Sequence, residues 1–460
     1  MLYGIFRVSA QFALRWYYSE LIVQGREHIP ANGPLLVVAN HPNALVDAMI
    51  VGTTLRRRVL ITARATLFEG RTLAGLLRRI GVVPLLRVQD VAVVAGTPGL
   101  LARNDASLER VTDALRLGEV VLIFPEGISH DRPSMAPLKS GAARIALQAL
   151  GKGAHTLHIL PIGLVYEEKE RPGTRVLVKI GRPMTVGAWL ANNPARGATA
   201  LTQEIARALH RVTLNFATED RAVRSIRLAR AFSLLRGGSL ETARGRDLED
   251  EVLTAARIET ATEALEQSPP TLQVRADVLI TGLQGLETSL AQRGIALPDA
   301  FVSSRVMHGL LFVLREMALA CAFLPLAMLG RVSHWLPLRT ARRLALYTLR
   351  SDPSRDQPAM RTILIGLVTV PAWYAIQAAV ISTLAGGARA AIWLSISFLG
   401  ANVDARYRGR IEGALQRARA FLVYRTDRSF QCAVVATSRD LLQQAAELEV
   451  ALLEIRVNAP

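Results

Sequence analysis

A histidine and an aspartate stand close together behind a short apolar run. His41 follows residues 34–39, and Asp47 lies one to two helical turns further along the chain. A neutral imidazole near a helix N-terminus is a suitable proton acceptor, because the helix dipole disfavours its charged form. A carboxylate bonded to the other ring nitrogen would fix the tautomer and stabilise the imidazolium. No serine or cysteine adjoins the pair as a nucleophile, so we predict a base that activates a substrate hydroxyl directly.

A second polar cluster follows another apolar run, residues 120–123. The sequence from 124 to 133 reads Phe-Pro-Glu-Gly-Ile-Ser-His-Asp-Arg-Pro, and Lys139 stands just beyond it. Polar residues at the ends of buried strands can meet at one edge of a sheet. The two clusters therefore predict one active site on an α/β sheet.

Short apolar runs alternate with helical periods in the first half of the chain. The predicted strands are residues 35–39, 59–62, 81–86, 120–124, 158–165 and 175–180. The predicted helices are residues 47–55, 67–79, 107–117, 140–150 and 200–216. This alternation predicts an α/β fold, a mixed sheet covered by helices, followed by a mainly helical, membrane-associated C-terminal region.

Composition favours a membrane partner over nucleic acid. Half of the 460 residues are hydrophobic and the net charge is +17, which suits anionic headgroups or phosphorylated substrates. Aromatic residues make up 5%, and no zinc-finger spacing is present, which argues against nucleic-acid binding. The two cysteines, Cys321 and Cys432, indicate neither a disulfide framework nor a metal site and favour a reducing compartment. We expect no metal and no cofactor.

Long uncharged runs appear after residue 306. Residues 362–388 carry no charge and could span about 30 Å of hydrocarbon, and residues 390–403 form a shorter uncharged run. Arginine-rich stretches flank the pair, so the positive-inside rule predicts a hairpin over 362–403 with both flanks cytoplasmic. Residues 309–330 contain Arg315 and Glu316, which fits an interfacial or re-entrant segment. The alternative is that all three runs are buried helices of a soluble domain.

The remaining regions complete a five-part organisation of an inner-membrane protein with a cytoplasmic catalytic domain. Residues 1–25 are predicted to be an interfacial membrane helix, or else a helix packed on the domain of residues 26–220. Residues 221–305 are a helical linker, residues 306–403 the membrane region, and residues 404–460 a helical cytoplasmic tail. The linker begins with a cationic stripe that would contact anionic lipid or form a solvated face: Arg221, Arg224, Arg227 and Arg230.

Four motifs in order resemble the conserved block of the glycerophospholipid acyltransferase superfamily. They are residues 40–47, 83–90, 124–132 and 160–164. Arg-x-Gln-Asp at 87–90 and Ser-His-Asp-Arg-Pro at 129–133 are most similar to the glycerol-3-phosphate/dihydroxyacetone-phosphate acyltransferase branch. The resemblance covers roughly residues 20–220.

The resemblance implies roles for individual residues. His41 would deprotonate a glycerol hydroxyl with Asp47 orienting it, and the alkoxide would attack the thioester of acyl-CoA or acyl-carrier protein. Arg87 would hold the substrate phosphate, unless it pairs with Asp90 as a structural bridge. Glu126 would belong to the substrate site, unless it only caps the following segment. The predicted substrate-binding residues are Asn43, Arg87, Phe124, Pro125, Glu126, Gly127, Ser129, Arg132 and Lys139.

Alternatives concern both the acceptor and the class of function. Glycerol-3-phosphate or dihydroxyacetone phosphate competes with lysophosphatidate or another lysolipid as acceptor. Five residues separate His41 from Asp47 where four are commoner in the superfamily, which weighs against the sn-2 lysophosphatidate enzymes. The alternative class is a non-catalytic lipid-binding membrane protein that retains the fold. The other seven histidines, including His130, are assigned no chemistry.

Overall fold

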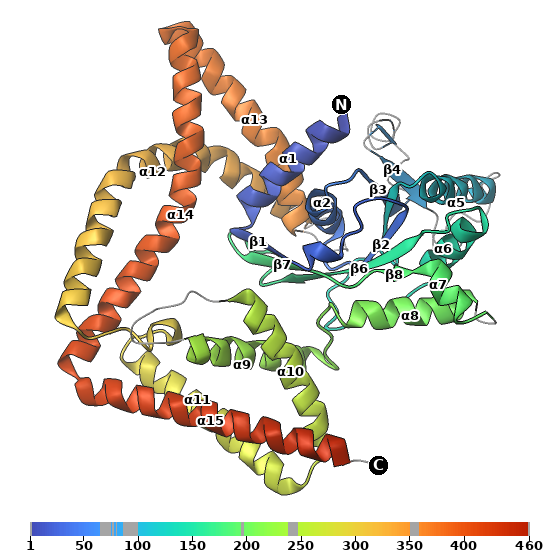
Figure 1. Cartoon of the computed structure of the whole chain (residues 1–460). Coiled ribbons are helices and arrows are strands. Elements are labelled where there is room, and N and C mark those ends of the chain that lie inside the picture. Colours follow the sequence, from blue (N-terminus) through green and yellow to red (C-terminus); the bar gives the residue numbers. More distant parts are fainter. Residues whose placement is uncertain are drawn as a thin grey trace. The chain divides into compact units, whose positions relative to one another are not determined.

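A computed structural model describes residues 2–64, 75, 78–79, 81–85, 100–194, 197–237, 247–349 and 358–458. The chain forms two compact units (Figure 1). The first contains residues 1–215 and 339–369, and the second contains residues 216–338 and 370–460.

The first unit is built on a mixed sheet, as the sequence predicts. Eight strands belong to it within the described residues, in the order β1-β7-β6-β2-β5-β3-β4, with β8 paired to β6. Strand β2 is central and runs parallel to both β5 and β6, so the carboxyl ends of these three strands share one edge. The strands are β1 (Glu20–Gln24), β2 (Leu35–Ala39), β3 (Val59–Arg64), β4 (Val82–Leu85), β5 (Val120–Ile123), β6 (His158–Tyr166), β7 (Arg175–Ile180) and β8 (Met184–Thr185).

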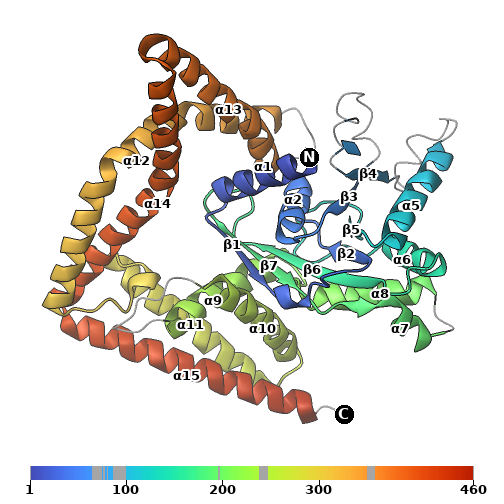
Figure 2. The same ribbon diagram turned by 45° about the horizontal axis from the view of Figure 1, so that its top comes forward.

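Helices cover both faces of the sheet because its central strands are apolar on both sides. Leu35 and Val37 of β2 pack in one core with α1 and α2, whereas Leu36 and Val38 pack in a second core with α5, α6 and α8. Figures 1 and 2 show the two helical layers. The helices are α1 (Leu2–Tyr17), η1 (Arg26–His28), α2 (Ala44–Thr54), α5 (Leu100–Arg116), α6 (Gly141–Gly151), α7 (Val186–Ala191) and α8 (Ala198–His210).

The predicted elements agree with the structure except at the margins of the unit. All six predicted strands are present, while β1 and β8 were not predicted. The predicted helix over residues 1–25 is too long: α1 ends at Tyr17, and residues 20–24 form β1, which pairs in parallel with β7. The predicted helix over 200–216 ends at His210. Most of the predicted helix over 67–79 lies outside the described residues.

Helix α1 has two apolar faces. One face packs into the core of the first unit through Ala10, Ala13, Leu14 and Tyr17. The other leaves apolar side chains exposed: Leu2, Ile5, Val8 and Phe12. Packing on the domain therefore leaves apolar side chains partly exposed along the same helix.

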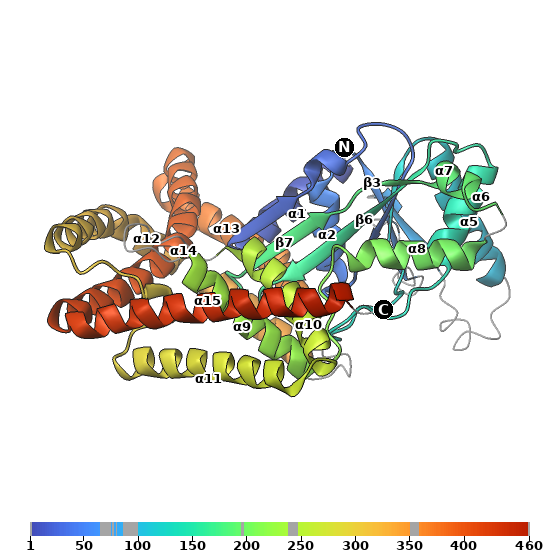
Figure 3. The same ribbon diagram turned by 60° about the horizontal axis from the view of Figure 1, so that its bottom comes forward.

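The second unit is helical. A core of buried leucines and alanines joins α9 (Glu219–Gly237), α11 (Pro270–Gln292) and α15 (Arg428–Asn458), and α10 (Leu248–Glu266) packs against α9. Figure 3 shows α11 and α15 as long helices of this unit. The predicted break at residues 268–270 is confirmed, because α11 begins at Pro270, where its missing N–H removes no helical hydrogen bond. A short turn, η3 (Leu297–Asp299), follows α11.

The cationic stripe on α9 is partly paired with glutamates of neighbouring helices. Arg221 pairs with Glu259 at 3.1 Å and with Glu266 at 2.9 Å. Arg227 pairs with Glu287 at 2.5 Å. These glutamates lie on α10 and α11, so Arg221 and Arg227 join helices, whereas Arg224 is exposed.

Three long helices form the apolar part of the chain: α12 (Val306–Leu349), α13 (Pro358–Ala385) and α14 (Gly387–Thr426). They correct two boundaries, because α12 continues through the basic residues after 330 and α14 continues past 403. Among the described residues, 309–348 and 358–385 are long and apolar enough to cross a membrane. Few residues in their most apolar windows are buried, 6% and 11% respectively. That exposure is unlike the core helix of a soluble domain.

Candidate active site

The two predicted clusters meet at the carboxyl edge of the sheet, where β2, β5 and β6 end together. Asn40 and His41 leave the end of β2. The Asn40 amide fixes this loop to β6: its Nδ2 donates to the Leu164 carbonyl at 3.0 Å, and its Oδ1 accepts from the Leu164 N–H at 2.7 Å. A paired side chain of this kind continues the sheet's hydrogen bonding and positions the residue that follows.

His41 and Asp47 form a hydrogen-bonded pair. The His41 Nδ1 lies 3.0 Å from Oδ2 of Asp47, whose side chain is fully buried. Because a carboxylate only accepts, Nδ1 must carry the proton, and the neutral ring then presents a lone pair at Nε2. No hydrogen-bond partner for Nε2 is found in the described part of the chain. The His41 side chain is 14% exposed, so a substrate hydroxyl can reach it.

Asp47 has two further donors that hold its carboxylate in place. The backbone N–H of Asn43 donates to Oδ2 at 2.7 Å, and the Tyr166 hydroxyl donates to Oδ1 at 2.5 Å. Burial raises the pKa of Tyr166 well above 10, and the adjacent Asp47 charge raises it further. Tyr166 therefore stays protonated and remains a donor. Asn43 is itself buried, and its Nδ2 donates to the Tyr18 hydroxyl at 3.1 Å.

The second cluster packs directly on His41. The Phe124 ring stacks on the imidazole, with centroids 3.9 Å apart and planes 14° apart. Glu126, which is 2% exposed, accepts the His41 N–H at 3.0 Å through Oε1. Its Oε2 accepts from the Ala136 N–H at 2.7 Å and from His130 Nε2 at 2.6 Å. Glu126 thus links the two clusters and does more than cap a segment.

A tight turn brings Lys139 over the same cluster. Gly127 has a φ of +73°, and a Cβ there would lie 3.2 Å from the Lys139 Cδ and 3.3 Å from its Nζ. Lys139 also donates its N–H to the Pro125 carbonyl at 2.8 Å. A glycine therefore suits this position for two reasons. Its backbone is left-handed, and the Lys139 side chain lies where a Cβ would point.

Ser129 supports the start of α2. Its Oγ accepts the Ala44 N–H at 3.0 Å. Ala44 has a φ of +44°, a left-handed conformation that costs a non-glycine residue roughly 1–3 kcal/mol and is found mostly at functional sites. The bond from Ser129 helps to hold that turn between His41 and Asp47.

The structure brings most of the predicted site residues together but not all of them. His41, Asp47, Asn43 and Ser129 are joined by the contacts above, as are Phe124, Pro125, Glu126, Gly127 and Lys139. The Arg132 side chain is exposed, and its backbone N–H donates to Nδ1 of His130 at 3.2 Å. Arg87 and Asp90 lie outside the described residues.

Sequence reasoning missed three members of this network. His130, to which no chemistry was assigned, contacts Glu126 and donates its backbone N–H to the His41 carbonyl. Tyr166 reaches Asp47 from 119 positions away, and Tyr18 reaches Asn43 from 25 positions away. For the tyrosines no local spacing gives a signal. For His130, its place inside the 124–133 cluster was the available signal.

Residues 20–165 match the family model named Acyltransferase. This part of the chain is an acyltransferase-family domain. The resemblance read from the four motifs is therefore confirmed for this part of the chain, which contains His41, Asp47 and the cluster at 124–133.

Several named proteins are similar to part of the chain. Glycerol-3-phosphate O-acyltransferase 2 of Saccharomyces cerevisiae is 33% identical over 117 residues, 24% of this chain and 16% of that protein. The mouse 1-acyl-sn-glycerol-3-phosphate acyltransferase alpha is 29% identical over 173 residues, 36% of this chain and 54% of that protein. An uncharacterized acyltransferase of Schizosaccharomyces pombe is 26% identical over 250 residues, 37% of each chain.

A solved structure was also found. The crystal structure of a 1-acyl-sn-glycerophosphate acyltransferase from Thermotoga maritima has a TM-score of 0.35 and 19% identity, and the match covers 45% of this chain and 77% of that one. The chain thus matches about half or less of the length of the curated relatives named above.

Proposed function

We propose that the protein transfers a fatty acyl group from acyl-CoA or acyl-carrier protein to glycerol-3-phosphate or dihydroxyacetone phosphate. The His41–Asp47 pair carries this proposal. Nε2 of His41 has no hydrogen-bond partner among the described residues and the side chain is partly exposed, while Nδ1 is held by a buried carboxylate with two more donors. Such an arrangement supplies a general base of fixed tautomer and orientation.

The reaction then needs no acyl-enzyme. Nε2 of His41 takes the proton of the acceptor hydroxyl as its oxygen attacks the thioester carbonyl carbon. A C–O bond forms, the C–S bond breaks, and the leaving thiolate takes the proton back from the imidazolium. Asp47 stabilises the imidazolium between these two steps. Stacking against Phe124 and the bond from the His41 N–H to Glu126 keep the ring in one orientation.

A phosphorylated acceptor is supported by one cation, Lys139, at the turn that follows Glu126. The Lys139 ammonium lies over Gly127, beside the Glu126 that bonds to His41. Arg87 stays a proposal from the second motif, as a clamp for the same phosphate. The yeast relative named for glycerol-3-phosphate and the Arg-x-Gln-Asp motif favour that acceptor class. Lysophosphatidate, the type of substrate in the mouse relative's name, is the competing acceptor.

We place the reaction at the cytoplasmic face of the inner membrane. Support comes from the two long apolar helices with few buried residues, from the exposed apolar face of α1 and from the arginine-rich flanks. These features would hold the first unit against the surface from which a lipid product must enter the bilayer.

An acceptor panel tests the proposal. Purified full-length protein is supplied with labelled acyl-CoA, or with acyl-carrier protein, and with each acceptor separately. We expect turnover with glycerol-3-phosphate or dihydroxyacetone phosphate to exceed that with lysophosphatidate. Turnover with lysophosphatidate alone would show that lysophosphatidate is the acceptor, while the proposed transfer mechanism would stand. Absence of transfer to every acceptor from both donors would favour the non-catalytic lipid-binding alternative.

A further inference from the structure

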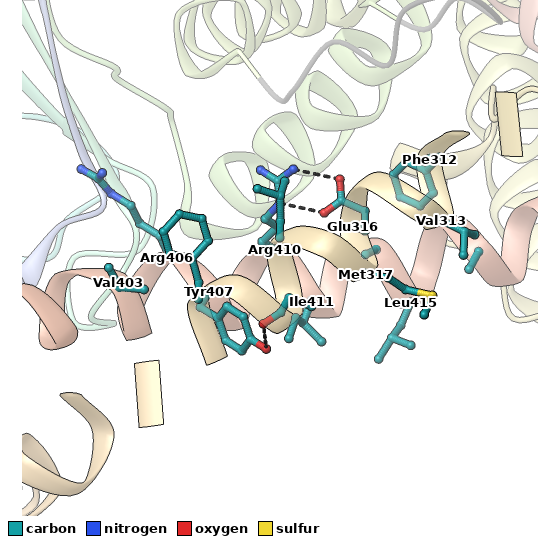
Figure 4. Close-up of a pocket in the computed structure, with 15 residues that line it drawn as sticks. Phe312, Val313, Glu316, Met317, Val403, Arg406, Tyr407, Arg410, Ile411 and Leu415 are labelled. Atoms are coloured by element: carbon teal, nitrogen blue, oxygen red, sulfur yellow. Dashed lines mark hydrogen bonds and ion pairs between the residues drawn. The ribbon is translucent and has the colours of Figure 1, made fainter. Parts of the chain in front are cut away.

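A groove lies between α12 and α14 in the second unit, remote in sequence from the acyltransferase-family domain. Its cavity volume is about 440 Å³, within the roughly 300–1,000 Å³ of small-molecule sites. Figure 4 shows side chains from the two helices that border it. The wall is mostly apolar, and its larger members are Phe312, Met317, Phe323, Ile411 and Leu415.

The two helices that form the groove are fixed to each other along their length. Glu316 on α12 pairs with Arg410 on α14, and the Tyr407 hydroxyl donates to the Ala320 carbonyl at 3.2 Å. Beyond the groove the backbones approach so closely that a Cβ on Gly330 would lie 2.0 Å from the Gly400 carbonyl carbon. Small residues that permit such approach are typical of helix pairs in membranes. The groove is therefore a formed site between two anchored helices.

The groove has more positively than negatively charged side chains: Arg406 and Arg410 against Glu316. Arg410 donates to both carboxylate oxygens of Glu316, at 2.7 and 2.8 Å, and Arg315 also donates to Glu316 at 2.9 Å. Arg406, which lines the end near Phe323, has an exposed guanidinium with no ion-pair or hydrogen-bond partner in the part of the chain that the structure describes. Figure 4 shows Arg406 pointing outward, away from the Arg410–Glu316 pair.

We propose that this groove binds an anionic membrane phospholipid. The phosphate would pair with Arg406, and one acyl chain would lie along the apolar wall between Phe323 and Leu415. An apolar channel with a free cation at one end complements an amphiphile that has one anionic head. The α12 side of the wall belongs to residues 309–348, which are long and apolar enough to cross a membrane. A membrane phospholipid is therefore available wherever this helix is inserted. This site is independent of the proposed acyl transfer.

Photocrosslinking in the full-length protein tests the site. The probe is phosphatidylglycerol with a diazirine in one acyl chain, added to detergent-solubilised protein, and labelled residues are mapped by mass spectrometry. We expect label concentrated in residues 312–323 and 411–418, above the level on the exposed apolar residues of α13. Unlabelled phosphatidylglycerol should compete, whereas glycerol phosphate, which has the head charge without a chain, should not.

Matched variants make the test specific. Arg406→Gln should reduce groove labelling about fivefold, since one arginine near an anionic lipid surface typically contributes about that factor. Arg425→Gln, which removes the same charge from α14 outside the groove, should leave labelling unchanged. Ala414→Phe should also reduce labelling by filling the groove. Uniform label over α12, α13 and α14, or equal labelling of wild type and Arg406→Gln, would show annular lipid only and overturn the proposal. Competition by glycerol phosphate would overturn it in favour of a free-phosphate site.

Discussion

Asp47 receives three hydrogen bonds, and only one of them comes from the histidine that it would orient. The Tyr166 hydroxyl donates to Oδ1, and the Asn43 N–H donates to Oδ2, the oxygen that His41 also contacts. The motif spacing identified His41 and Asp47 because they lie only six positions apart in the sequence. It could not identify Tyr166, because strand β6 brings that residue in by tertiary pairing with β2.

Tyr166→Phe tests whether this tyrosine positions Asp47 or merely fills space. A buried carboxylate oxygen left without a donor destabilises the folded protein by about 1–3 kcal/mol. We also expect kcat to fall, because Asp47 is then held less firmly against His41. A carboxylate with one donor fewer also holds the protonated imidazole more strongly, so the acidic limb of the rate profile should move to higher pH. Tyr17→Phe is the control, because it also removes a buried tyrosine hydroxyl, one that donates to the Glu170 carbonyl at 2.9 Å. If the rate falls but the acidic limb of the pH–rate profile does not move, Tyr166 has only a structural role.

Lys139→Gln tests the proposed phosphate contact. Loss of a charge-assisted hydrogen bond typically costs about 1.5–3 kcal/mol, so the KM for the phosphorylated acceptor should rise roughly ten- to hundredfold. The KM for acyl-CoA should change little. Lys152→Gln removes a surface lysine near Asp113 and serves as the control. Equal effects on the two substrates would instead indicate that Lys139 stabilises the Gly127 turn.

At the scale of elements, the central strands could be predicted because both their faces are buried. Residues 35–39 and 120–123 read as uninterrupted apolar runs, and every residue of β2 and β5 is buried. Strand β1 is an edge strand with no buried residue, so its sequence, Glu-Leu-Ile-Val-Gln, gave no comparable signal. The ends of α12 and α14 could not be placed either, since basic residues continue each helix beyond its apolar run.

The exposed apolar face of α1 predicts contact with the membrane surface. A fluorophore sensitive to polarity, attached to Ile5→Cys in a background without Cys321 and Cys432, should shift to shorter wavelength on reconstitution into anionic liposomes. The same fluorophore at Arg110→Cys, exposed on α5 at the opposite face of the sheet, should not shift. Identical spectra at both positions would contradict the interfacial assignment of α1.

At the scale of the whole molecule, the chain combines an acyltransferase-family domain at residues 20–165 with a helical region that follows it. The hairpin predicted over 362–403 stays a prediction. Its turn lies at Gly386, where a φ of +90° separates α13 from α14. By length and composition, 309–348 is a second candidate to pair with 358–385. Arginines between these two helices would then face outward, against the positive-inside rule.

Labelling of single cysteines distinguishes these topologies. Gly387→Cys, in a chain lacking Cys321 and Cys432, should react with a membrane-impermeant maleimide in intact spheroplasts, because the hairpin turn would lie outside. In a second protein, Cys432 is kept as the single cysteine. This residue is exposed on α15 and should react only after permeabilisation. Protection of both positions until permeabilisation would rule out the 362–403 hairpin. If residue 353 is replaced by cysteine and that cysteine is labelled in intact spheroplasts, the result would support 309–348 and 358–385 as the membrane-spanning pair.

The central claim is that His41 is the base of a direct acyl transfer, and the turnover of His41→Ala tests it most directly. The full-length variant and wild type are compared with saturating acyl-CoA and each acceptor, after thermal unfolding shows that both are folded. A positioned general base contributes about 10²–10⁴-fold, so the account predicts a loss of at least a hundredfold in kcat in a variant that still folds. A folded His41→Ala protein that retained more than about a tenth of wild-type turnover would contradict it.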